Sequence, residues 1–364
     1  MPFSDFHGNV EVVRRLREML AGEHFPHAVI LSGPAGAGKF TLTQMIAKAM
    51  NCLERPVSDG LPDFCGRCAN CTRIAEADAL EQRFAEAVEA RENLREADQR
   101  ETRIFVQTHP DVLIIPPDPP QMMVKVDQVR HLIREIYYKP IDGRERVYIF
   151  SAADFMKEAA NALLKVLEEP PGFSTIFLLT GNPSALLPTI RSRCVHLRLA
   201  PLGREELEQY LARVRPEWKA RERSLVARVC GGGPGGARSF DLAAYLAARQ
   251  DALTLLAAAM GTRDHSELFR MTDAYRSGAE GKARTEQLIR LLYSLLEDML
   301  FLREGTPELA RNQDIQPDLV HLVERVDFPW IVAAVQRLGG VESGMRRNLL
   351  RSLALDAFAT SLER

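Results

Sequence analysis

The stretch HAVILSGPAGAGK, residues 27–39, decides the fold of the amino-terminal part of the chain. Its apolar run over residues 28–31 predicts a buried strand, and a helical pattern begins directly after the glycine-rich turn. Residues 33–39 fit the spacing G-x-x-x-x-G-K, in which backbone amides surround phosphate oxygens at a helix N-terminus and the lysine reaches the outer phosphates. We therefore predict a strand, a phosphate loop and a helix, with these candidate nucleotide-binding residues: Gly33, Gly36, Gly38 and Lys39.

Three groups that a working nucleotide hydrolase needs are missing around this loop. The position after the lysine should be a Ser or Thr whose hydroxyl binds magnesium, but it is Phe40. Thr41 lies about 100° further round the helix, which makes it a poor substitute. The strand RVYIF should be followed by two carboxylates, but Ser151 and Ala152 stand there. We expect no ATP hydrolysis and no bound ATP, although Lys39 and the glycines leave nucleotide binding open; the alternative is a loop that only packs the fold.

Strands alternate with helices over the first 200 residues or so. RVYIF (146–150) and STIFLLT (174–180) predict strands, and between them a helix from about residue 155 to 169 ends at a double proline. Asp154 is interpreted as the N-cap of that helix. This alternation predicts a parallel sheet covered by helices on both faces.

Helical patterns dominate from residue 201 onward. The glycine cluster GGGPGG (231–236) is expected to separate helices inside a small domain, and the residues from about 251 predict further amphipathic helices. At roughly 100–200 residues per domain, the length fits an α/β core over residues 1–200, a small helical domain over 201–248 and an all-α domain over 249–364.

Four cysteines follow the first core helix at zinc-ligand spacing. Two-residue gaps place successive thiolates on one metal ion, and four soft ligands favour tetrahedral zinc, with an iron–sulfur cluster as the alternative. Since no coordination position would remain open, the zinc should be structural. We predict this zinc module over residues 52–71, with the ligands Cys52, Cys65, Cys68 and Cys71. The isolated cysteines at 194 and 230 are interpreted as small buried hydrophobic residues.

A charged segment over residues 75–103 comes next, with nine acids, five arginines and no Gly or Pro. It predicts one long solvated helix or a helical hairpin. A narrow apolar stripe from Ala77 to Leu94, interrupted by Arg91, could form a docking surface, but we favour a solvated spur. Our hypothesis is that its deletion leaves folding intact.

The composition of the 364 residues excludes several classes of protein. With 46% apolar residues and no apolar run near the ~20 residues that a membrane helix needs, disorder and membrane insertion are both disfavoured. The amino terminus lacks the pattern of a secretion signal, so we expect a cytoplasmic location. A balance of 47 basic against 49 acidic residues argues against a free-standing nucleic-acid binder.

Several motifs together point to one family: HAVILSGPAGAGK, the cysteine module, THPDV, VDQVRHLI, NALLKVLEEPP and TIRSRC. In this combination the chain resembles the bacterial clamp-loader branch of the AAA+ proteins, within the DNA polymerase III holoenzyme. The resemblance covers about residues 1–240 apart from the charged insertion, which relatives lack. It implies an AAA+ core followed by a small helical lid and a helical collar that builds a hetero-pentamer.

The resemblance also implies a role for this chain among the clamp-loader subunits. Motor subunits, called gamma or tau, keep the catalytic groups that are missing here, so this chain is similar to the non-hydrolysing delta-prime class. In that class the motif Ser192-Arg193-Cys194 supplies an arginine finger in trans to ATP on a neighbouring motor subunit. The implied partners are gamma/tau and delta subunits, the sliding clamp and primed DNA, and the implied enzyme is the DNA-directed DNA polymerase holoenzyme.

Other interpretations remain open for the whole chain and for single residues. The chain could be an active motor ATPase, or a zinc-dependent DNA-binding protein with a vestigial core. Arg193 could form a structural ion pair, and Arg191 is a weaker finger candidate. Thr180 and Asn182 could sense phosphate or cap a turn, and Arg238 could be a second sensor or a surface charge. Lys165, Glu168 and Glu169 are read as shaping their helix and its neighbour contacts.

Overall fold

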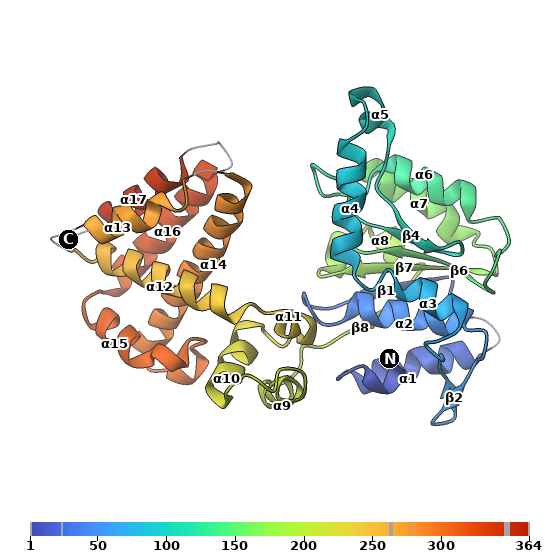
Figure 1. Cartoon of the computed structure of the whole chain (residues 1–364), viewed down its shortest axis with the longest axis horizontal. Coiled ribbons are helices and arrows are strands. Elements are labelled where there is room, and N and C mark those ends of the chain that lie inside the picture. The colour runs from blue at the N-terminus through green and yellow to red at the C-terminus, as the bar shows by residue number, and fades with distance from the viewer. Residues whose placement is uncertain (1, 23–24, 262–264, 277, 346–349, 363–364) are drawn as a thin grey trace. The chain divides into compact units, whose positions relative to one another are not determined.

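The computed structural model describes residues 2–22, 25–261, 265–276, 278–345 and 350–362 (Figure 1). The chain divides into two compact units. The first contains Met1–Gly203 and Gly232–Gly236, and the second contains Arg204–Gly231 and Ala237–Arg364. Residues 232–236 therefore belong to the first unit although residues on both sides of them belong to the second.

A six-stranded sheet forms the centre of the first unit. The strand order is β4-β5-β6-β7-β1-β8, and β5, β6, β7, β1 and β8 run parallel, as the alternation of strands and helices predicted. The edge strand β4 is antiparallel to β5 and was not predicted. The strands are β1 (Ala28–Ser32), β4 (Val106–His109), β5 (Val112–Ile115), β6 (Arg146–Phe150), β7 (Ser174–Thr180) and β8 (Val195–Arg198).

Helices cover both faces of this sheet, and its central strands are therefore buried on both sides. Val29 and Leu31 of β1 face a core shared with α1 and α2, whereas Ala28 and Ile30 face a core shared with α6 and α7. Figure 1 shows α1 and α2 on one side of the sheet and α6 and α7 on the other. The bounds are η1 (Phe3–Asp5), α1 (Val10–Ala21), α2 (Lys39–Asn51), α6 (Val126–Glu135), α7 (Lys157–Glu168), η2 (Pro183–Ala185) and α8 (Pro188–Arg191).

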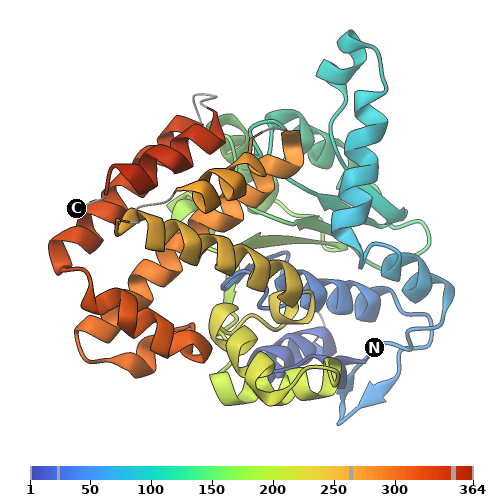
Figure 2. The same ribbon diagram turned by 60° about the vertical axis from the view of Figure 1, so that its left-hand side comes forward.

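The cysteine module and the charged insertion lie between β1 and β4 in the chain. A hairpin of β2 (Val57–Ser58) and β3 (Leu61–Pro62) turns at Asp59 and Gly60, whose φ angles of 51° and 75° suit the twist of a two-residue hairpin turn. The insertion follows α3 (Ala69–Ala75) and consists of two helices, which the hairpin alternative anticipated. These are α4 (Leu80–Glu92) and α5 (Glu96–Glu101), which project together from the unit (Figure 2).

The insertion is attached to the core through charges, which the sequence pattern did not indicate. Asp118 is fully buried, and its carboxylate receives Arg91 from the end of α4. Arg103 Nε and Lys125 Nζ lie 3.8 and 3.7 Å from the same carboxylate, and Arg103 Nη2 also pairs with Asp127 at 3.0 Å. Arg91, which interrupts the apolar stripe, is therefore an anchor of the spur.

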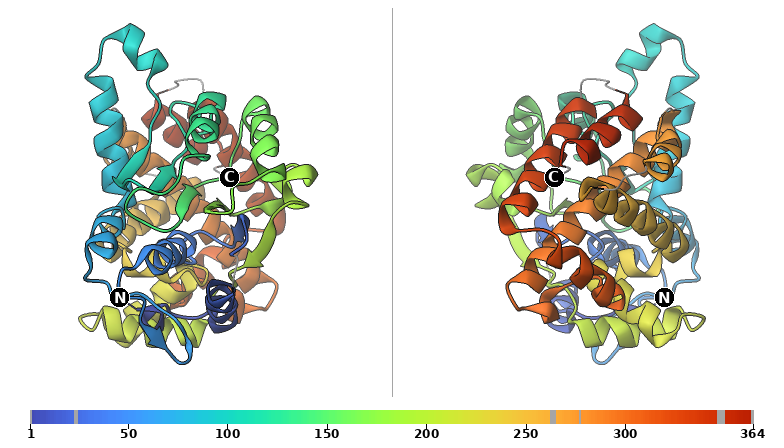
Figure 3. Two further views of the ribbon diagram at one scale, coloured as in Figure 1. Left: turned by 90° about the vertical axis from the view of Figure 1, so that its right-hand side faces the viewer. Right: turned by 90° about the vertical axis from the view of Figure 1, so that its left-hand side faces the viewer.

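The described residues of the second unit form helices around one continuous core. Leu255, Leu292, Leu295, Trp330 and Phe358 are buried in it, and α12, α14, α16 and α17 pack on one another (Figure 3, orange to red). The bounds of the elements after residue 203 are α9 (Arg204–Val214), α10 (Ala220–Val229), α11 (Pro234–Arg238, shared between the two units), α12 (Leu242–Ala259), α13 (Ser266–Asp273), α14 (Gly278–Arg303), η3 (Pro307–Leu309), η4 (Gln313–Ile315), α15 (Gln316–Glu324), α16 (Phe328–Met345) and α17 (Arg351–Thr360).

The expected border between the second and third domains at residue 248 falls inside α12. The two parts share this helix and one core, so their separation into a lid and a collar stays a prediction. Within the described residues, no helix has both the length and the apolar character that crossing a membrane requires.

Candidate functional site

The phosphate loop has the predicted position between β1 and α2. Gly33, Gly36 and Gly38 have φ angles of 152°, 72° and 87°, a region that favours glycine. Lys39 Nζ donates hydrogen bonds of 2.7 Å to the carbonyl oxygens of Gly33 and Pro34, and burial lowers the pKa of this amine. The lysine therefore braces the loop from within.

Around the loop, the structure places no metal-binding hydroxyl at position 40 and no carboxylates at positions 151 and 152. Phe40 packs against the core beneath α2, and Thr41 is exposed. Ser151 and Ala152 follow β6 at the carboxyl end of the sheet, where the missing carboxylates would lie. No carboxylate stands at either position, so the end of β6 lacks the acids that hold magnesium and orient water in phosphoryl-transfer enzymes.

Asp154 is not the helix cap that the sequence suggested. The N-cap of α7 is Met156, and Asp154 is exposed. Its carbonyl oxygen accepts a 2.7 Å hydrogen bond from Val124 N, within a short extended pairing of Val124 with Phe155. This pairing holds the backbone extended and delays the start of the helix.

A second glycine segment packs directly on the phosphate loop, a contact that sequence reasoning missed. Gly235 N donates a 2.8 Å hydrogen bond to Gly36 O. A Cβ added at Gly233 would lie 2.6 Å from Ala35 O, and one at Gly36 would lie 2.8 Å from Gly236 N. Only the first half of the glycine cluster separates α10 from α11, because residues 234–236 already lie inside α11. Residues 232–236 also belong to the first unit and not to a small second domain as expected, and they form a strap against the tip of the loop. We call these five residues the glycine strap.

The polar residues after β7 form a turn. Thr180 Oγ1 accepts a hydrogen bond from Asn182 N at 3.1 Å, and Asn182 Oδ1 accepts one from Ser184 N at 3.0 Å. These contacts match the turn-capping alternative for both side chains. Arg238 is exposed, and its carbonyl oxygen accepts a 3.0 Å hydrogen bond from Arg215 Nε.

The motif Ser192-Arg193-Cys194 lies between α8 and β8. Arg193 Nη2 is 2.7 Å from Glu168 Oε1, and Arg193 Nη1 donates a 2.9 Å hydrogen bond to Thr189 O. Ser192 Oγ donates to the same carbonyl oxygen at 3.1 Å. Burial raises the pKa of the Cys194 thiol to about 12, so this side chain stays neutral and packs against the core. Burial likewise raises the pKa of Cys230 to about 11.

Arg193 and the phosphate loop of the same chain lie at opposite ends of the sheet. Val195 at the start of β8 pairs with Val29, and Arg198 at its end pairs with Ser32, which precedes the loop. Because β1 and β8 are parallel, Arg193 lies at the amino ends of the strands and the loop at their carboxyl ends. About 13 Å of strand, the rise of four residues, separates the two ends.

The four predicted metal ligands come together in one cluster. The sulfur atoms of Cys52, Cys65, Cys68 and Cys71 all lie within 4.8 Å of one another. Tetrahedral zinc with bonds of about 2.3 Å needs sulfurs about 3.8 Å apart, so the cluster needs only a small contraction. Backbone amides of Cys65 and Cys68 already point at the sulfurs of Cys52 and Cys65, at 3.3 and 3.2 Å.

At least two thiols of the cluster resist ionisation when no positive charge is nearby. Burial opposes ionisation of Cys68, but backbone hydrogen bonds from Cys71 and Leu53 and side-chain hydrogen bonds with Cys71 and Cys65 together lower the pKa of this thiol to about 7. Burial raises the pKa of Cys65 and Cys71, so these thiols need a positive charge to ionise. A metal ion would supply that charge, and a tetrahedral ion held by all four sulfurs would have no position left for a substrate.

Hydrogen bonds attach the cysteine module to the loop before β6. Asn70 Nδ2 donates to Asn51 O and to Asp142 O at 3.0 and 3.1 Å, and Arg73 pairs with the Asp142 carboxylate at 2.7 Å. Arg144 Nη2 donates to Cys52 O at 2.9 Å. Side-chain hydrogen bonds and one ion pair therefore connect the cysteine module to this loop and to the end of α2.

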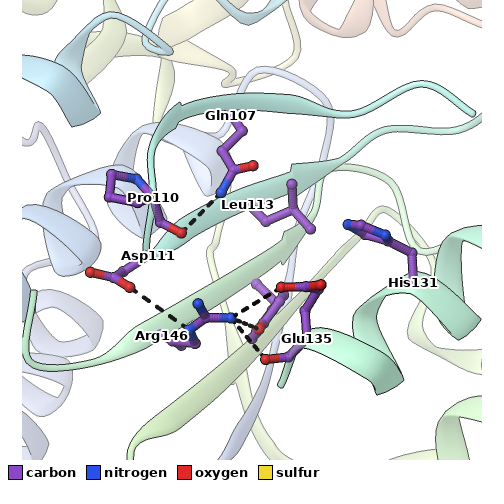
Figure 4. A pocket seen from close by; sticks show the side chains of 8 residues that line it. Gln107, Pro110, Asp111, Leu113, His131, Glu135 and Arg146 are labelled. Atoms are coloured by element: carbon purple, nitrogen blue, oxygen red, sulfur yellow. Dashed lines mark hydrogen bonds and ion pairs between the residues drawn. The ribbon is translucent and has the colours of Figure 1, made fainter. Parts of the chain in front are cut away.

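The THPDV motif orders the same loop. Asp111 accepts hydrogen bonds from the backbone amides of residues 141, 142 and 143 at 2.8, 2.8 and 2.6 Å. Figure 4 shows its carboxylate beside Arg146, whose Nε lies 3.7 Å away, while Arg146 Nη1 donates to Glu135 O at 2.8 Å. The buried charges lining this small pocket bind one another, so the motif has a structural role.

Comparison with known proteins matches this architecture to one family. The model of the family described as "DNA polymerase III, delta subunit" matches residues 8–203, more than half of the chain. The chain belongs to this family of bacterial clamp-loader subunits of the AAA+ type. The family match covers the sheet, the phosphate loop, the cysteine cluster and the Ser-Arg-Cys motif.

Individual relatives include both delta' and tau subunits of DNA polymerase III. The DNA polymerase III subunit delta' of Pseudomonas aeruginosa is 32% identical over 209 residues, covering 57% of this chain and 53% of the relative. The subunit tau of Salmonella typhimurium is 27% identical over 390 residues, covering 97% of this chain and 54% of the relative. The chain thus spans about half the length of these relatives. A gamma subunit-related protein of Thermotoga maritima aligns over 96% of this chain and 98% of its own, with 16% identity and a TM-score of 0.43.

Proposed function

We propose that the chain is a non-hydrolysing, delta-prime-like subunit of the DNA polymerase III clamp loader. One observation carries the proposal: the phosphate loop keeps its lysine, but Phe40, Ser151 and Ala152 occupy the positions of the metal ligand and the two acids. A loop without these groups has no means to hold magnesium or to orient an attacking water. The proposed partners are gamma/tau motor subunits and a delta subunit in a hetero-pentamer, the sliding clamp, and primed DNA through the assembled ring.

The position of Arg193 supports a role in a neighbour's site. It lies at the end of the sheet opposite its own phosphate loop, so it can serve only a nucleotide bound to another chain. We propose that it acts as an arginine finger with Ser192 and Cys194 as its structural frame. Fingers supplied in trans are worth about 10³–10⁵ in rate because they neutralise charge that develops on the transferred phosphoryl group.

We propose a structural zinc ion held by the four cysteines. The sulfur spacing and the amide-to-sulfur hydrogen bonds support this metal, and its chemistry there is to bind four thiolates and fix the module. The ion has no part in the phosphoryl transfer on the neighbouring subunit.

The test is ATP turnover with and without partners. We expect no turnover by the isolated full-length chain. In a complex reconstituted with motor and delta-type subunits, Arg193→Ala should abolish turnover at the one site that this chain serves and so lower the total. Arg191→Ala is the matched control, because Arg191 is an exposed arginine two residues away.

Two outcomes would contradict the proposal. Appreciable turnover by the isolated chain would favour the active motor ATPase. Unchanged turnover in the Arg193→Ala complex would remove the finger assignment.

A further inference from the structure

The Arg193 guanidinium is already held by two acceptors in the isolated chain. Glu168 Oε1 lies 2.7 Å from Nη2, and Thr189 O accepts from Nη1 at 2.9 Å. The two acceptors come from different helices, since Glu168 ends α7 and Thr189 lies in α8. They fix both the position and the plane of the guanidinium.

An acidic residue at the carboxyl end of α7 is unfavourable for the helix itself. The last carbonyl oxygens of a helix carry partial negative charge, so a carboxylate in the final turn is unfavourable. Glu168 is the last residue of α7, and the chain reaches Pro170 two residues later. The ion pair with Arg193 offsets this unfavourable placement. Among the described residues, the neighbouring Glu169 side chain has no such partner.

We propose that Glu168 is a positioning residue for the arginine finger, an inference that rests on the proposed function of Arg193. A guanidinium has five N–H donors, and two are used here, which leaves three for phosphate oxygens of a neighbouring nucleotide. Holding the long arginine side chain in place beforehand lowers the entropy lost when it meets its ligand. The pair is partly exposed, 34% for Arg193 and 52% for Glu168, so it can adjust when phosphate arrives.

The experiment compares two adjacent acids in the full-length chain, reconstituted with motor and delta-type subunits. We expect Glu168→Ala to lower the kcat of the site served by this chain by about two- to fivefold, the size of the effect of an exposed ion pair, with KM for ATP little changed. Glu169→Ala, the matched control, should leave kcat unchanged. Glu168→Gln keeps an acceptor oxygen and should restore part of the loss.

A double variant separates positioning from a general structural effect. Because Glu168 acts through Arg193, adding Glu168→Ala to Arg193→Ala should cause no further loss. Melting temperature and assembly of each variant, measured by calorimetry and gel filtration, should match those of the unaltered chain.

Several results would overturn the inference. The inference would be overturned by equal kcat for the Glu168 and Glu169 variants, or by a further loss when Glu168→Ala is added to Arg193→Ala. It would also be overturned by a rise in kcat for Glu168→Ala, which would mean that Glu168 keeps the arginine from the nucleotide. An Arg193→Ala complex with unchanged turnover would instead overturn the proposed function itself, and this inference with it.

Discussion

Single residues decide what chemistry is left at the phosphate loop and at the cysteine cluster. Lys39 persists and braces the loop, but one aromatic side chain at Phe40 removes the metal-binding hydroxyl. At the cluster, four thiols stand close together on a base of buried hydrogen bonds. Burial raises the pKa of Cys65 and Cys71, which makes the arrangement costly to ionise without a metal.

Removing one ligand of the cluster should therefore remove the metal. We expect Cys71→Ser to lose bound zinc and to lower the melting temperature, since metal binding contributes directly to folding free energy. Cys230→Ser is the matched control, because Cys230 lies outside the cluster and should leave the zinc content unchanged. Zinc is measured by mass spectrometry of the purified protein. One equivalent of zinc retained in Cys71→Ser would contradict the assignment.

At the scale of elements, the insertion α4–α5 is a spur tied to the core by charge. All nine of its acids are exposed, while Arg91 and Arg103 turn inward to Asp118 and Asp127. Because of this attachment, we now expect that deletion of residues 75–103 would destabilise the fold, contrary to the hypothesis drawn from the sequence. Deletion would leave the buried Asp118 carboxylate with Lys125 as its ion-pair partner, 3.7 Å away.

Arg91→Ala alone should reproduce most of the destabilisation expected from the deletion, because it removes the hydrogen-bonded partner of Asp118. Loss of a charged hydrogen bond to a buried carboxylate costs about 1.5–3 kcal/mol, so the free energy of unfolding should fall by this amount. Arg95→Ala, an exposed arginine of the same insertion, should change it by less than about 0.5 kcal/mol. Denaturant unfolding measures both, and equal stability of the two variants would show that the anchor contributes nothing.

At the scale of the whole molecule, the glycine strap is a late segment of the chain that belongs to the first unit and packs on the phosphate loop. The chain passes from one compact unit to the other after residues 203, 231 and 236, so residues of the second unit precede and follow the strap in the sequence. Its contact with the loop is backbone on backbone, with no space for a Cβ at Gly36 or Gly233.

Two alanine substitutions within the strap test this contact. Gly233→Ala places a methyl group 2.6 Å from Ala35 O, so we expect a loss of about 1–3 kcal/mol in stability and faster hydrogen exchange of the loop amides 35–40. Gly236→Ala meets nothing within 4 Å and should change neither. Identical exchange in both variants would show that the strap does not restrain the loop.

Sequence patterns by themselves determined the phosphate loop, the parallel sheet, the missing catalytic groups and the cysteine cluster. Each depends on residues close together in the chain, where periodicity, turn chemistry and ligand spacing act locally. The antiparallel edge strand β4, the Asp118 anchor, the glycine strap and the pairing of Glu168 with Arg193 were decided only by the tertiary structure. Asp118 and Arg91 are 27 residues apart, and Glu168 and Arg193 are 25 apart. The partner of a charge or the neighbour of a glycine is chosen by how the chain packs, because burial and close approach depend on segments that no local pattern connects.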